Sequence, residues 1–275
     1  MAFSVLTNAG AFAALQNLRS VNTDLANTQQ RIATGLRVSS AKDDAATFAI
    51  AQNLRSDIAG LDAVQASLSR ASSSADVALA AGEAVSDLLI ELKEKAVAAK
   101  DSGLDTASRQ SLNDDFEQLR DQITSIVENA EFNGTNILSG AGDIISAITD
   151  SVGDNTVQIA EQNLTLGGGN VLITATQGIA TAAAASAAVD AIEQSIANVN
   201  SALSSIGSGA RRIELQTNFT QKLSDTIEVG IGNLVDADLA AEAANLQALQ
   251  VRQQLAIQAL SIANSAPSSI LQLFR

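Results

Sequence analysis

Two long series of apolar residues dominate the chain, and in both series successive members are three or four positions apart. The first runs from Leu61 to Ala99 with no charged residue in it, and the second runs from Val189 to Ile213. A stripe with this spacing lies along one side of an α-helix and forms the seam through which coiled-coil helices pack. The pattern therefore predicts two long helices that pack against each other. The bulky residues of the predicted seam are Leu61, Val64, Leu68, Leu89, Leu92, Ile192, Ile196, Val199, Leu203, Ile206 and Ile213.

The first long helix is predicted to occupy residues 41–100, roughly 90 Å at about 1.5 Å of rise per residue. Ser40 and Asp43, near its start, have the three-residue separation of a capping box. The polar stretch at 101–103 ends this helix, and a further helix with its own apolar stripe is predicted to begin near Thr106. A compact domain does not require a helix of this length, so the pattern favours an extended assembly.

Residues 2–34 form another predicted helix, and Gly35 suits the left-handed conformation that often follows a helix C-terminus. Asn22 and Gln29 are placed at intermediate positions of the apolar stripe on this helix. The bulky members of the stripe are Leu15, Leu18, Leu25, Ile32 and Leu36.

The helical period stops between residues 132 and 178. Asn133-Gly134 is a dipeptide preferred in two-residue hairpin turns, and short segments of weakly alternating apolar residues follow it. The three glycines at 167–169 lack the Lys-Ser/Thr pair and the following helix of a phosphate-binding loop, so they are interpreted as a turn. This region is predicted to contain short strands and turns.

Helix is predicted again from Thr181 to about Ile227, after which Gly230 and Gly232 loosen the chain. The last helix is predicted to end near Asn264. Together these patterns predict a mainly α fold in which long antiparallel helices form a coiled-coil-like bundle with a small β-hairpin region.

The last helix is apolar on two faces, and a helix of this kind must be covered on both. The N-terminal helix can cover one face, so we expect other copies of the chain to cover the second. Residues 1–18 and 253–274 contain no charged side chain, which fits burial. A helical pair that closes a monomeric bundle is the alternative interpretation. The residues expected to act in self-assembly are Leu15, Leu18, Leu25, Ile32, Leu246, Leu249, Val251, Leu255, Leu260, Ile262, Leu271 and Leu273.

Composition limits the chemistry that the chain can perform. It has 30 acidic and 16 basic residues, a net charge of −14, whereas nucleic-acid binding needs a basic face. It contains no Cys and no His, which removes disulfides, thiol nucleophiles and the commonest general base and metal ligand. We therefore expect no catalytic residue, no cofactor and no metal. No basic segment precedes the first apolar residues and no apolar run reaches about 20 residues, so neither a secretory signal nor membrane insertion is expected.

Several blocks of sequence resemble bacterial flagellins. The N-terminal block is NLRSVNTDLANTQQRIATGLRVSSAKDDAATFAIAQNL, and the Phe132-Asn133-Gly134 turn follows it. Near the other end, Asp236-Ala237-Asp238, a Gln-rich stretch and the ending ILQLFR are similar to the flagellin C-terminus. The segments NLVDADLAAE and QALSIANS look most like alphaproteobacterial flagellins.

The resemblance implies a filament subunit with a flagellin core fold. Residues 1–40 and 231–275 would pair as an inner core domain that lines the filament channel, and residues 41–230, including 132–178, would form an outer core domain. The subunit would be secreted through the type III export channel and would polymerise into the extracellular flagellar filament that transmits motor torque for swimming. Its partners would be other copies of itself, other flagellins, an export chaperone, and the cap and hook-associated proteins.

Two alternatives remain open at this point, a hook–filament junction protein and, more distantly, a self-contained coiled-coil adaptor. Flagellins that carry a peptidase need His-Glu-x-x-His, and this chain has no His. Flagellins that activate the Toll-like flagellin receptor present an arginine, a glutamate and a leucine before an Ala-Val pair. Alignment on Ala96-Val97 places Glu91, Glu94 and Lys95 at those positions, so only the glutamate is kept and weak activation is expected.

Overall fold

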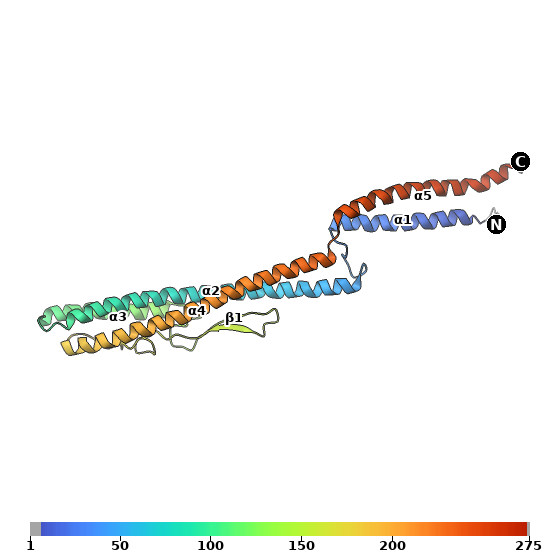
Figure 1. The fold of residues 1–275 in the computed structure, drawn as a ribbon. Coiled ribbons are helices and arrows are strands. Elements are labelled where there is room, and N and C mark those ends of the chain that lie inside the picture. Colours follow the sequence, from blue (N-terminus) through green and yellow to red (C-terminus); the bar gives the residue numbers. More distant parts are fainter. Residues whose placement is uncertain (1–6, 274–275) are drawn as a thin grey trace. The chain divides into compact units, whose positions relative to one another are not determined.

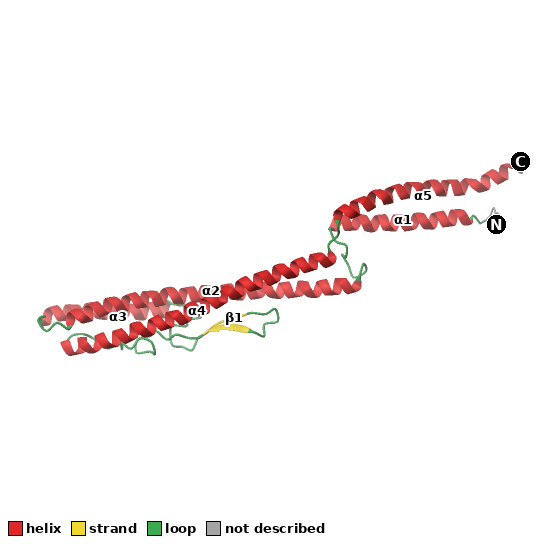
Figure 2. Ribbon diagram, in the orientation of Figure 1, coloured by secondary structure: helices red, strands yellow, loops and turns green. Residues whose placement is uncertain are grey.

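The computed structural model describes the backbone of residues 7–273 and the side chains of residues 7–265, and this part contains five helices and two strands (Figure 1, Figure 2). Two of the helices have 55 and 54 residues, several times the common helix length of about 11–12. The predicted mainly α fold with a small β-hairpin region is confirmed. In order the elements are α1 (Ala9–Thr34), α2 (Ala45–Ala99), α3 (Thr106–Asn129), β1 (Ile145–Ile148), β2 (Thr156–Ile159), α4 (Ala182–Val235) and α5 (Leu239–Leu273).

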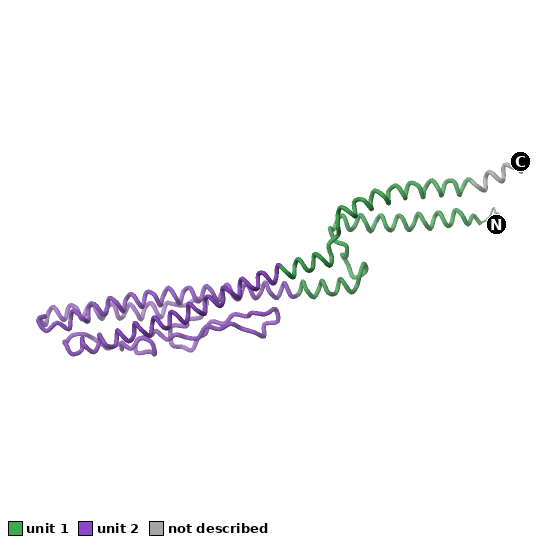
Figure 3. The backbone as a smooth tube through the Cα atoms, viewed as in Figure 1, with its two compact units in different colours: residues 1–56, 226–275 green, residues 57–225 purple. Residues whose placement is uncertain are grey.

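The chain divides into two compact units (Figure 3). Residues 57–225 form one, here called the bundle unit, and residues 1–56 with 226–275 form the other, here called the terminal unit. α2 and α4 contribute to both units, whereas α3 and the strands belong to the bundle unit and α1 and α5 to the terminal unit.

In the bundle unit α2, α3 and α4 share one apolar core. Every member of the first apolar series, from Leu61 to Ala99, is buried. The helix α3 adds Phe116, Ile123 and Val127, of which the first two are completely buried. The stripe spacing read from the sequence therefore marks the side of each helix that faces the others.

The helices α2 and α4 run antiparallel. The side chains of Gln65 and Gln221 are joined by a hydrogen bond of 2.6 Å, and an ion pair of 2.9 Å joins Lys93 to Glu193. A Cβ atom on Gly82 would lie 2.6 Å from Cδ2 of Leu203, so glycine at this position lets the two helices approach closely.

The region between α3 and α4 contains fewer strands than its apolar alternation suggests. β1 and β2 pair antiparallel, with Ile145 opposite Ile159. The predicted hairpin turn is confirmed, since Asn133 and Gly134 both have positive φ, 51° and 82°, and Phe132 and Thr135 bond to each other across it. The later apolar segments at 164–166 and 171–173 form only an isolated bridge, and Leu164, Val171 and Ile173 are completely buried in the core that the helices share.

The terminal unit contains α1 and α5, and the segments that follow α1 and α4 pair beside them. Gly35 has a φ of 72° and closes α1 through its N–H to the Arg31 carbonyl, as predicted. The N–H groups of Arg37 and Val38 donate to the carbonyl of Val235, and Leu36 forms an isolated bridge with Asp236. These bonds hold the ends of two distant helices together.

Two predicted helix starts differ from the structure. α1 begins at Ala9, where the Asn8 side chain accepts a bond from the Ala11 N–H; residues 2–6 of the predicted helix lie outside the described residues. α2 begins at Ala45 rather than 41, because Asp44 accepts from the first free N–H groups. The predicted Ser40–Asp43 box therefore closes a loop and does not cap the helix.

Two predicted helix ends are wrong. α4 continues through Gly230 and Gly232, because buried Ile231 and Val235 extend its packed face beyond the predicted end at Ile227. α5 passes the predicted end at Asn264 and continues through Pro267 to Leu273. A helical proline removes the N–H that would bond the carbonyl four residues earlier, here that of Ala263. The Asn8 side chain donates to this carbonyl at 2.6 Å and so replaces the missing bond.

Candidate self-assembly surface

In the terminal unit α1 and α5 meet along one stripe of each helix. Buried and half-buried positions recur on both helices at alternating steps of three and four residues, as in a coiled coil. On α1 these positions are Ala11, Ala14, Leu18, Val21, Leu25, Thr28 and Ile32. On α5 they are Glu242, Leu246, Leu249, Gln253, Ala256, Leu260 and Ala263.

One part of the predicted α1 stripe is wrong. Asn22 and Gln29 were expected at intermediate seam positions, but both are exposed. Because the seam advances three residues from Leu18 and Leu25, it reaches Val21 and Thr28.

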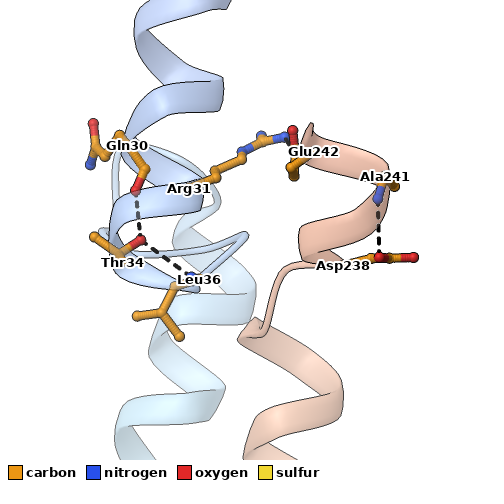
Figure 4. Close-up of polar contacts among 7 residues, drawn as sticks. All are labelled: Gln30, Arg31, Thr34, Leu36, Asp238, Ala241 and Glu242. Carbon is orange, nitrogen blue, oxygen red and sulfur yellow. Dashed lines mark hydrogen bonds and ion pairs between the residues drawn. The ribbon is translucent and has the colours of Figure 1, made fainter. Parts of the chain in front are cut away.

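Polar contacts fix the antiparallel pairing of α1 and α5. Arg31 Nη1 lies 3.1 Å from Oε1 of Glu242, which is only 12% exposed (Figure 4). Two turns or more away on each helix, the Gln253 amide donates to the Asn22 side chain at 2.8 Å. Each contact joins a residue nearer the end of one helix to a residue nearer the start of the other, which excludes a parallel pair.

A second stripe of α5, here called the open stripe, points away from α1. Its large side chains Val251, Leu255 and Ile262 are 56%, 58% and 71% exposed. The spacing is again three and four, so one face of α5 is fully uncovered. The members of the open stripe are Ala241, Ala244, Ala248, Val251, Leu255, Gln258 and Ile262, and all are exposed.

The structure places the predicted self-assembly residues in two groups. Leu246, Leu249 and Leu260 lie in the stripe covered by α1, and Val251, Leu255 and Ile262 lie in the open stripe. The α1 members Leu15, Leu18, Leu25 and Ile32 are half-buried. The side chains of Leu271 and Leu273 lie outside the described residues.

The predicted self-assembly set omits several exposed apolar residues of the terminal unit, and two of them lie near the ends of the chain. Phe12 on α1 is 67% exposed, and Ile257 on α5 is 52% exposed. Both lie in the charge-free segments, and that absence of charge is the signal that includes them.

The predicted seam residues are placed in the bundle unit. Those on α2 are all at most 4% exposed, and Ile192, Val199, Ile206 and Ile213 on α4 are completely buried. Ile196 and Leu203 are half-buried and pack against the edge of the core. The structure thus brings the two apolar series together along α2 and α4.

The receptor-motif positions lie on the outer side of α2. Glu91 and Glu94 are exposed, and Lys95 forms a 2.9 Å ion pair with Asp115 of α3. The hydrogen bond from Lys95 to Asp115 and the charge of that carboxylate raise the pKa of Lys95 above its usual value. Lys95 therefore connects α2 to α3 as well as occupying the motif position.

Neither a metal site nor a membrane span is found in residues 7–273. No group of three or more His, Cys, Asp or Glu side chains there is arranged to hold a metal ion. None of the helices in this range combines the length and apolar character needed to cross a bilayer.

Both ends of the chain match known protein families. The bacterial flagellin N-terminal helical region matches residues 5–143, and the bacterial flagellin C-terminal helical region matches residues 189–274. The chain belongs to the bacterial flagellin family. Flagellin FljM of Caulobacter vibrioides is 47% identical over 272 residues, which cover 99% of this chain and 98% of that flagellin. The predicted likeness to alphaproteobacterial flagellins is confirmed.

Solved structures support the flagellin fold. Bacillus cereus flagellin has a TM-score of 0.50 at 22% identity, covering 56% of this chain and 88% of that chain. A Vibrio parahaemolyticus structure described as a flagellar hook-associated protein has a TM-score of 0.60 at 16% identity, covering 70% and 100%. At these identities the likeness concerns the fold alone, so the second structure does not favour a junction protein.

Membership of the flagellin family establishes the function. This flagellin is a structural subunit that polymerises into the bacterial flagellar filament, the helical tube that transmits motor torque for swimming. It works outside the cell as part of the filament, and it is not an enzyme. Self-association is therefore its central interaction.

Proposed function

We propose that the open stripe of α5 is the principal self-assembly surface of this flagellin and is covered by neighbouring copies in the filament. The observation that carries the proposal is the exposure of Val251, Leu255 and Ile262 along one face of a helix whose opposite face is already packed on α1. Full burial of one such side chain is worth about 1.5–3 kcal/mol. A repeated contact of this kind would stabilise every added subunit.

The open stripe of α5 also suggests how the chain is divided into domains in the filament. Residues 1–40 and 231–275 form the inner core domain, and residues 41–230 form the outer core domain. The inner core is the part with charge-free ends, and 1–18 and 253–274 are suited to a packed interior. Gln247, Gln250 and Gln254 lie on a third, exposed side of α5 and give the channel a polar, uncharged lining.

In a filament the open stripe must be covered by a different surface of the neighbouring copy. Two open stripes packed on each other through a two-fold axis would close a dimer and stop growth. Contacts between unlike surfaces repeat from copy to copy and generate a helical polymer when they do not close.

The exposed open stripe of the unassembled subunit also suggests which other proteins bind it. Before assembly the open stripe faces water, and exposed apolar surface of this kind invites aggregation. An export chaperone would cover it during secretion, and the cap and hook-associated proteins would meet the same terminal unit at the filament ends. Other flagellins with the same helical ends would co-assemble.

Assembly of point variants tests the proposal. Leu255→Asn and Ile262→Asn are expected to prevent filaments or to raise the critical concentration strongly, as measured by sedimentation and electron microscopy. The matched control Gln254→Asn, on an exposed polar side of the same helix, should assemble normally. Because the changed side chains are exposed, the monomer's free energy of unfolding should change by no more than about 0.5 kcal/mol. Normal filaments from both stripe variants would refute the proposal.

A further inference from the structure

A polar cavity of about 410 Å³ lies in the terminal unit, between α1 and the loop that joins it to α2. The Gln30 amide donates to the Ser39 hydroxyl at 3.0 Å and so holds this loop on α1. All nine residues that line the cavity are polar or charged, so it suits a polar ligand. They are Thr23, Asn27, Gln30 and Arg31 from α1, and Arg37, Ser39, Ser40, Lys42 and Asp43 from the loop.

The cavity gathers positive charge in an acidic chain. The chain has a net charge of −14, but residues 1–42 contain four basic side chains and one acidic side chain, Asp24. Three of those four cations, Arg31, Arg37 and Lys42, line the cavity. A hollow lined mainly by charges of one sign concentrates the electric field and attracts ions of the opposite sign.

The three cations keep hydrogen-bond donors available for a ligand. Nη2 of Arg37 donates to the Leu234 carbonyl at 2.7 Å, and Nη1 of Arg31 donates to Glu242 at 3.1 Å. A guanidinium has five N–H donors, so each arginine retains others. Lys42 is exposed, and its ammonium forms no ion pair with a carboxylate of residues 7–265.

The neighbouring carboxylates are already bonded to other groups. Oδ2 of Asp43 accepts four hydrogen bonds of 3.0–3.1 Å, from the N–H and hydroxyl groups of Ser39 and Ser40. Asp44 accepts from the first N–H groups of α2 and from the Thr47 hydroxyl. Arg37 and Lys42 are therefore left to bind an anion from solution.

We propose that this cavity binds a small multivalent oxyanion, such as phosphate or sulfate, through Arg37 and Lys42 of the loop, with Arg31 on the α1 side. Hydrogen bonds between charged groups are about twice as strong as neutral ones, and a guanidinium can hold two oxygens at once. A small ion is favoured over nucleic acid, because the rest of the acidic surface would repel an extended polyanion. This site is additional to filament assembly and does not depend on the proposed α5 surface.

Titration of the monomer with sodium sulfate, compared with sodium chloride at the same ionic strength, tests the site. The amide resonances of Ser39, Ser40 and Lys42 should follow a saturable curve with sulfate and change little with chloride. Lys42→Gln should weaken sulfate binding about tenfold, because a charge-assisted hydrogen bond is lost, whereas Lys42→Arg should retain binding. The Lys42 side chain has no ion pair to lose, so both variants should fold normally.

Arg19→Gln is the matched control, because Arg19 is exposed on α1, lies outside the cavity and carries the same charge. It is 12 residues, or about 18 Å, from Arg31 along the helix, which exceeds the Debye length of about 8 Å at physiological salt. Its affinity for sulfate should therefore stay within about twofold of the native value. Shifts that grow linearly with sulfate, or equal weakening in Arg19→Gln and Lys42→Gln, would overturn the site while leaving the α5 proposal intact.

The same titration with inorganic phosphate and with glycerol 3-phosphate separates a free ion from the phosphoryl group of a larger molecule. The free ion is the predicted ligand, so inorganic phosphate should bind at least as tightly as the ester. Binding of the ester alone would overturn the assignment of a free ion.

Discussion

The side-chain amide of Asn8 donates a 2.6 Å hydrogen bond to the carbonyl of Ala263, 255 residues later in the chain. The same side chain accepts from the Ala11 N–H and so caps α1. The Ala263 carbonyl has no helical donor four residues on, because that position is Pro267. One asparagine therefore completes the hydrogen bonding of two helices.

This arrangement predicts a coupling between Asn8 and Pro267. Asn8→Ala should lower the local stability of the α1–α5 pair by about 2 kcal/mol, because it removes both a cap and the partner of a carbonyl. In a Pro267→Ala background the carbonyl regains an N–H donor, so Asn8→Ala should cost only about 1 kcal/mol, the value of the cap. Native-state hydrogen exchange of α1 amides in the monomer measures both. Equal costs in the two backgrounds would show that the two positions are not coupled.

The bundle seam predicts a position-dependent response to charge. Ala75 on α2 is completely buried, whereas Ala80, five residues on, is exposed. Ala75→Lys should lower the free energy of unfolding by about 3 kcal/mol or more, because an unpaired ammonium would enter an apolar contact. Ala80→Lys should change it by about 0.5 kcal/mol at most. Chemical denaturation of the two monomers compares them, and similar midpoints would contradict the assigned seam.

How far the sequence predicted the fold depends on the range of the interactions involved. The seam at Leu68 and Leu89 could be predicted because its period follows from helix geometry alone. The continuation of α5 through Pro267 could not, because it depends on Asn8 at the far end of the chain. The continuation of α4 past Gly230 likewise depends on the tertiary burial of Ile231.

The candidate surfaces were predictable to a similar extent. Two apolar faces on α5 were visible in the sequence, but which face α1 covers required the structure. The α1 stripe was predicted to pass through Asn22, but it passes through Val21. A shift of one residue along the helix cannot be recognised without knowing where the partner helix lies.

The loop between α1 and α2 should respond to acid. Hydrogen bonds from the hydroxyls of Ser39 and Ser40, and from their backbone N–H groups, hold the pKa of Asp43 below its usual value of 3.8. A lowered pKa means that the stabilising contribution is complete above about pH 3.8 and is lost as the pH falls through the lower folded value. We expect the Ser39 and Ser40 amide resonances of the monomer to shift in that range.

The variant Asp43→Asn provides the control for this titration. It lacks the carboxylate, so the acid-dependent shift of the two serine amides should disappear while their bonds weaken at neutral pH. An unchanged titration in the variant would assign the response to another group, such as Asp44, whose pKa is also lowered, chiefly by the Thr47 hydroxyl and N–H.

The motif positions on α2 predict weak activation of the Toll-like flagellin receptor. Glu91 is exposed where activating flagellins carry an arginine, and Lys95 is tied to Asp115 where they carry a leucine. A reversed charge and a lost apolar anchor each weaken an interface, the anchor by about 2 kcal/mol or more. Glu91→Arg with Lys95→Leu should raise activation in a reporter-cell assay, provided the remaining surface is retained.

The structural role of Lys95 must be controlled in that experiment. Lys95→Leu removes the ion pair with Asp115, which is partly exposed and worth at most about 1 kcal/mol. Asp115→Asn breaks the same pair without supplying the leucine, so it should not raise activation. Strong activation by the unmodified monomer would overturn the prediction.

Thiol labelling at Leu255 tests most directly the claim that the open stripe of α5 is an interface between copies. The native chain has no cysteine, and Leu255 is 58% exposed in the isolated chain, so a Leu255→Cys thiol should react rapidly with a maleimide in the monomer. If neighbouring copies cover the open stripe, the same thiol should react at least about tenfold more slowly in intact filaments and recover its rate on depolymerisation. Equal labelling rates in filament and monomer would contradict the account.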